Sequence, residues 1–73
     1  MYSLEQVPAG NSATVNRIHG KGALRKRLLD MGFTRKTEIT VRKHAPLGDP
    51  IEVSVRGAEV TVRRADAAQI EVI

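Results

Sequence analysis

The chain has 73 residues and no cysteine, so it has room for one domain and can form no disulfide, Cys-ligated zinc site or iron–sulfur cluster. Its 41% hydrophobic residues suffice for a core, which must be aliphatic because only Tyr2 and Phe33 are aromatic. The net charge of +4 is uneven, since residues 21–36 hold six basic residues against Asp30 alone. The excess is therefore one basic patch, which could face nucleic acid, anionic lipid or an acidic protein.

The first half of the chain predicts one strand followed by one helix. Residues 13–16 alternate between apolar and polar side chains, which predicts a strand ending near Ile18. After Gly20-Lys21-Gly22, residues 23–31 place Leu24, Leu28 and Met31 on one helical face. Gly32 suits the left-handed position that ends a helix, and Phe33 is expected to close that end against the core.

The second half of the chain predicts short strands. Alternating apolar residues mark strands at residues 39–41, 51–55, 60–62 and 70–72, with a turn at 45–50, a tight hairpin at 56–58 and a helical turn at 66–69. Each strand has one apolar face, so curling the sheet buries all these faces together. The expected fold is mostly β. It is a small SH3-like barrel of about five strands with one helix inserted between the first two, a single domain over residues 1–73.

No residue pattern indicates catalysis or a bound cofactor. Gly20-Lys21-Gly22 lacks the earlier glycine and the Ser or Thr of a phosphate-binding loop. His19 and His44 have no metal-ligand spacing, and no serine lies in a Gly-x-Ser-x-Gly context. We therefore expect no enzymatic activity, no cofactor and no resident metal. No apolar run is long enough to cross a bilayer and no signal peptide is apparent, which predicts a cytoplasmic protein.

Two features favour an interaction surface but leave alternatives open. The basic helix that contains Arg25 and Lys26 could be a solvated face, a partner-docking face or a phosphate-contacting face. Leu47 lies in a polar turn, where it could either plug one end of the barrel or remain exposed as an anchor for a partner.

Several segments together resemble the FeoA family. They are residues 27–33 (RLLDMGF), 45–51 (APLGDPI) and 62–72 (VRRADAAQIEV), and the start of the chain also fits. The family resemblance implies an SH3-like barrel and a small accessory role in bacterial ferrous iron transport. Typical members have Pro-Gly where this chain has Arg35-Lys36, so its turn must form without glycine.

The resemblance also implies a partner, the membrane transporter FeoB, which carries a cytoplasmic G domain. The chain would then reach the membrane only through this partner. Arg25, Lys26, Lys36, Leu47 and Asp49 are the candidate partner-binding residues. An RNA-binding role remains as an alternative because small basic SH3-like barrels also occur on RNA, although no stable nucleic-acid complex is expected.

Overall fold

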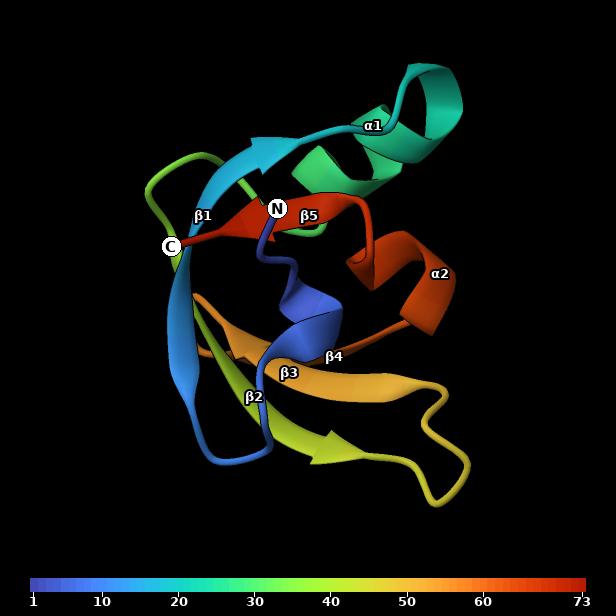
Figure 1. Cartoon of the computed structure of the whole chain (residues 1–73). Coiled ribbons are helices and arrows are strands. Elements are labelled where there is room, and N and C mark those ends of the chain that lie inside the picture. Colours follow the sequence, from blue (N-terminus) through green and yellow to red (C-terminus); the bar gives the residue numbers. More distant parts are fainter.

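A computed structural model describes all 73 residues as five strands, two helices and one short 3-10 helix (Figure 1). In chain order these are η1 (Leu4–Gln6), β1 (Ser12–Ile18), α1 (Gly22–Asp30), β2 (Glu38–His44), β3 (Ile51–Val55), β4 (Ala58–Val62), α2 (Arg64–Ala67) and β5 (Ile70–Val72). The mostly β composition and the helix between the first two strands are as predicted. No helix has the length and apolar character required to span a bilayer.

The five strands form one antiparallel sheet in the order β4-β3-β2-β1-β5. The fold agrees with the prediction, but the sheet does not close into a barrel, because β4 and β5 do not pair and remain its edges. β4 and β5 stay apart because, after α2, the chain places β5 beside β1 and not beside β4. In Figure 1, η1 lies between β5 and the lower strands, and it packs against both α2 and β5. Helical segments thus cover the core where a fifth pairing, between β4 and β5, would close a barrel.

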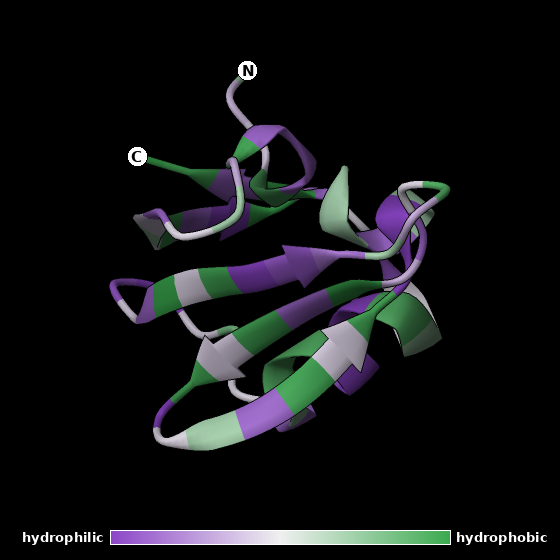
Figure 2. Ribbon diagram, turned by 90° about the horizontal axis from the view of Figure 1, so that it is seen from below, coloured by the Kyte–Doolittle hydropathy of each residue, from purple (hydrophilic) through white to green (hydrophobic).

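The strands form where side chains alternate in polarity, as Figure 2 shows by colour. In β3, Ile51, Val53 and Val55 are buried while the residues between them face outward. A two-residue turn of Arg56 and Gly57 joins β3 to β4, and both residues have positive φ (51° and 82°). This geometry matches the right-handed twist of paired strands, and it confirms the predicted hairpin.

Helix α1 ends as the sequence predicts. Gly32 has φ 106°, its N–H donates to the Leu29 carbonyl, and the Phe33 N–H donates to the Leu28 carbonyl. These two bonds form a Schellman motif, which satisfies carbonyls at the end of the helix. Leu28 and Phe33 are both fully buried, so the motif also fixes the helix end to the core.

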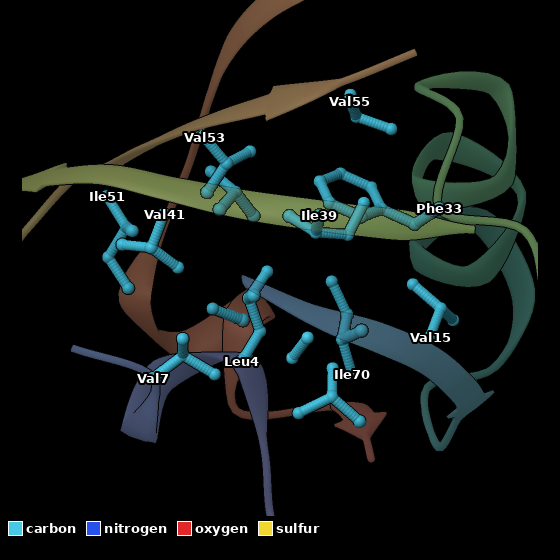
Figure 3. Close-up of a cluster of buried hydrophobic side chains, with 14 of the residues drawn as sticks. Leu4, Val7, Val15, Phe33, Ile39, Val41, Ile51, Val53, Val55 and Ile70 are labelled. Atoms are coloured by element: carbon cyan, nitrogen blue, oxygen red, sulfur yellow. The ribbon is translucent and has the colours of Figure 1, made fainter. Parts of the chain in front are cut away.

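One apolar cluster of 16 buried residues holds the fold together (Figure 3). It includes Leu4, the first residue of η1, and Val7, which follows η1; the sequence analysis left both outside any element. The η1 turn is capped locally, because the Ser3 N–H donates to Gln6 Oε1 at 2.9 Å. The N-terminal segment also covers part of the β5 edge, since the Val72 N–H donates to the Tyr2 carbonyl.

Candidate partner-docking surface

A groove of about 760 Å³ runs between β1 and α1 and is lined by four basic side chains. We call it the basic groove and define its cations as Arg17, Lys21, Arg25 and Arg35. Apolar side chains form its floor, among them Ile18, Leu29 and Phe33. A charged rim over an apolar floor is a suitable arrangement for binding another molecule.

Three segments supply these cations: β1, α1 with its N-cap residue, and the turn before β2. Arg17 lies in β1 at a register shift between Val15 and Arg17 in the pairing with β5. Lys21 is the N-cap residue of α1, Arg25 lies four residues further along the helix, and Arg35 lies in the turn before β2. Arg25 also fixes the groove wall, because its Nη1 donates to the Ile18 carbonyl at 3.1 Å.

The four groove cations have no carboxylate partner, which is also true of Lys26, Lys36, Lys43, Arg56 and Arg63. Elsewhere, Arg27 pairs with Asp66 at 2.9 Å. Arg42 and Arg64 likewise form ion pairs, with Glu59 at 3.5 Å and with Glu5 at 3.0 Å. No groove cation lies within ion-pair distance of an acidic group. The nearest carboxylate, Glu71, lies opposite Arg17 in the β1–β5 pairing and offsets part of its charge without forming an ion pair with it.

Glu71 is the acidic residue held beside this groove, and its charge is already engaged. Its Oε1 lies 2.6 Å from His19 Nε2, and its Oε2 accepts a hydrogen bond from Asn16 Nδ2. The hydrogen bond with His19 lowers the pKa of Glu71 below its ordinary value of 4.5, and the bond with Asn16 adds to this effect. Both partners line the groove, so Glu71 orders one wall of it.

The structure places three of the expected partner-binding residues on or near α1. Arg25 lines the basic groove, whereas Lys26 is exposed on α1 outside it. Lys36 is exposed in the turn before β2, and its backbone N–H donates to the Val15 carbonyl at 2.7 Å. Its φ of 72° confirms that this turn forms without glycine.

Leu47 and Asp49 lie on the loop between β2 and β3, whose tip points away from α1 in Figure 1. Leu47 is 91% exposed, so it does not plug the end of the fold. Asp49 Oδ1 accepts the backbone N–H of Arg64 at 3.0 Å, which satisfies a free donor at the start of α2. Asp49 also lines a second groove, of about 710 Å³, together with Arg27 and Arg63.

No group of three or more histidine, aspartate or glutamate side chains gathers where it could hold a metal ion. His19 is paired with Glu71, and His44 Nε2 lies 3.0 Å from the Val7 carbonyl. Each histidine therefore has a polar partner within the chain.

Comparison with known proteins gives consistent matches. The FeoA domain family model matches residues 2–73. A fusion of Fe(2+) transport protein A with the Fe(2+) transporter FeoB, from Porphyromonas gingivalis, is 44% identical over 69 residues, or 94% of this chain. The match spans only 8% of that relative's length.

Solved structures agree with the fold. The FeoA protein from Chlorobium tepidum is 41% identical with a TM-score of 0.89, over 96% of this chain and 67% of that one. FeoA from Stenotrophomonas maltophilia, solved with zinc and described as a prokaryotic SH3 domain protein, is 26% identical. Its TM-score is 0.87, over 100% of this chain and 91% of that one. The fold is therefore SH3-like, with an open sheet.

Proposed function

The chain belongs to the FeoA domain family, and we propose that it serves bacterial ferrous iron uptake by binding a FeoB-type membrane transporter. The observation that carries this proposal is the relative in which the matching segment and FeoB share one polypeptide. A covalent tether keeps a domain at its partner at high effective concentration. A separate chain must reach the same partner through affinity, and an exposed docking surface supplies it. The partner's cytoplasmic G domain is the proposed point of contact.

The proposal assigns a binding role to the chain and no catalytic step. The relatives do not favour the RNA-binding alternative, since they are iron transport proteins. Support from this chain itself is the set of unpaired cations beside α1, together with the exposed Leu47.

Iron uptake by cells tests the function directly. Cells that express a FeoB-type transporter, with and without the chain, are compared for the rate of radiolabelled Fe²⁺ uptake at equal transporter abundance. We expect the rate to change when the chain is removed and to return when it is restored. Identical rates with and without the chain would contradict the proposal.

Leu47 is the proposed apolar anchor of this contact. Buried apolar anchors dominate the affinity of interfaces, whereas charges at the rim mainly set the association rate. Because Leu47 is 91% exposed in the free chain, Leu47→Ala should leave the fold intact and increase the rate of dissociation from the transporter's cytoplasmic domain. Ile73→Ala is the matched control, because Ile73 is another exposed aliphatic residue (75%). Equal dissociation rates for both variants would exclude Leu47 as the anchor.

Arg25, Lys26 and Lys36 form a proposed charged contact beside α1 that is separate from the anchor, and Asp49 belongs to the loop that carries Leu47. Asp49 also caps α2 through its Oδ1, so truncating it would disturb the fold as well as the surface. Asp49→Asn is the appropriate variant for binding measurements, since it keeps the oxygen acceptor and removes the charge.

A further inference from the structure

The basic groove combines four unpaired cations with an apolar floor, and no carboxylate lines it. Such a site is complementary to a ligand that carries several negative charges and at least one apolar group. A bare inorganic anion would leave the apolar floor unused. An acidic peptide provides both kinds of group.

The spacing of the cations also favours an extended peptide. Lys21 is the extended N-cap residue of α1 (φ −127°), Arg25 lies within the helix, and Arg17 and Arg35 come from β1 and the turn before β2, so the cations are spread over three segments that border one groove. In an extended chain, side chains at alternate positions lie on one face about 6.6 Å apart. An extended peptide with carboxylates at alternate positions can therefore present several charges to cations that are spread along one groove.

Recognition in the groove is by side chains rather than by strand addition. The pairing of β1 with β2 covers only Ser12 to Thr14, so the later part of β1 is not paired with β2. The Val15 N–H is taken by the Thr37 carbonyl, and the Ile18 carbonyl is taken by Arg25. These occupied backbone groups disfavour pairing with a further strand.

We propose that the basic groove binds an extended acidic peptide segment in which carboxylates alternate with apolar residues. The proposal rests on the proposed function only for the source of the segment, which would be the cytoplasmic part of the transporter. The groove cations contact the carboxylates, and the floor around Leu29 contacts an apolar side chain of the segment.

A blocked Glu-Leu-Glu-Leu-Glu peptide is the probe. It is titrated into the isotopically labelled chain while backbone amide signals are followed by NMR, with Gln-Leu-Gln-Leu-Gln as the uncharged control. We expect signals to shift at residues 16–25 and at Arg35, and the affinity to decrease as NaCl is raised from about 50 mM to about 300 mM. Shifts confined to other residues, or equal binding of the control peptide, would overturn the proposal.

Matched variants locate the binding. Arg17→Gln with Arg35→Gln removes two groove cations, and we expect it to weaken peptide binding about fivefold. Arg42→Gln with Lys43→Gln removes the same charge from β2, outside the groove, and should have little effect. If both double variants weaken peptide binding equally, the affinity depends on the net charge of the chain and not on the groove, which would overturn the proposal. Inorganic phosphate binding the same residues as tightly as the peptide would also overturn it, in favour of a simple anion site.

The outcome separates this proposal from the proposed function. If the transporter domain binds and the groove variant binds it equally well, the groove proposal fails and the function stands. If the peptide binds in the groove but the transporter domain does not bind the chain, the function fails and the groove remains an acidic-peptide site with another source of ligand.

Discussion

Lys36 holds a backbone conformation that lysine rarely adopts. Its φ is 72°, and the turn is closed by the Thr37 N–H, which donates to the Thr34 carbonyl at 3.1 Å. A residue with a Cβ is strained in this left-handed region, whereas glycine is not. The structure holds the conformation because the Lys36 N–H and the Val15 N–H both bond across the turn.

Lys36→Gly should therefore stabilise the protein. Relief of the strain exceeds the added freedom of the unfolded chain, which gives a net gain of about 0.5–1 kcal/mol in the free energy of unfolding. Urea denaturation measures this change. Lys36→Gln is the control, since it removes the charge and keeps the Cβ, and it should change little. A glycine variant no more stable than the glutamine variant would contradict this account.

Glu71 predicts a specific dependence of stability on pH. Because its pKa in the folded state is lowered, chiefly by the hydrogen bond with His19, its carboxylate stabilises the fold above its ordinary value of 4.5. This contribution is lost as the pH falls from that value through the lower folded pKa. Glu71→Gln should therefore destabilise the protein more at about pH 7 than at about pH 3. Urea midpoints of both proteins at each pH measure this, and an equal difference at the two pH values would contradict it.

Arg17 shows why the basic groove could not be found from the sequence. Summed over residues 1–20, its charge is cancelled by Glu5. In the structure Glu5 pairs instead with Arg64, 59 residues away, while Arg17 lies unpaired beside Arg25. Charge summed along the chain does not describe charge in space. The one indication in the sequence was that Arg17 lies only four residues before the basic segment at residues 21–36.

At the scale of elements, α1 depends on a single fully buried leucine. Leu28 is 0% exposed, whereas Leu24, Leu29 and Met31 are only partly buried against the core. Leu28→Ala should therefore lower the free energy of unfolding by about 2–5 kcal/mol. Leu29→Ala is the matched control on the same helix and should cost less. Thermal melts of the two variants that coincide would show that α1 does not depend on this residue.

The regular strands were predictable, and the short helical segments were less so. Ile51, Val53 and Val55 alternate with polar residues, and this period alone identifies β3 and its inward face. The η1 turn has three residues and no period to detect, and its burial depends on contacts with α2 and β5. Helix α2 was expected at residues 66–69 and lies at Arg64–Ala67, because its first N–H is capped by the distant Asp49.

At the scale of the whole molecule, the sheet closes less completely than its apolar pattern suggested. Strand periodicity shows that each strand has a face to bury, but it does not show which edges pair. Here β5 completes the sheet beside β1, and η1 and α2 cover the remaining core. The fold class was therefore predictable, whereas the pairing of its last strand depends on long-range contacts.

The charges are also distributed unevenly over the molecule. Three of the ion pairs involve Arg27, Arg42 and Arg64, whereas all the other lysines and arginines form none, and four of these unpaired cations gather in the basic groove. Unpaired charge on one side of a small protein steers association with an oppositely charged partner, and salt weakens this steering. Association with the transporter should therefore be fast at low salt, and changes to the cations gathered beside α1 should slow it more than changes to basic residues elsewhere.

The measurement that tests the central claim most directly is the association rate of the chain with the cytoplasmic domain of a FeoB-type transporter, followed over a range of NaCl concentrations. We predict that the rate decreases with salt, and that Arg25→Ala with Lys26→Ala lowers the rate and flattens its salt dependence. Arg42→Ala with Lys43→Ala, which removes equal charge from β2, should leave both unchanged. Circular dichroism verifies that each variant is folded. Absence of binding, or binding that no variant alters and salt does not weaken, would contradict the account.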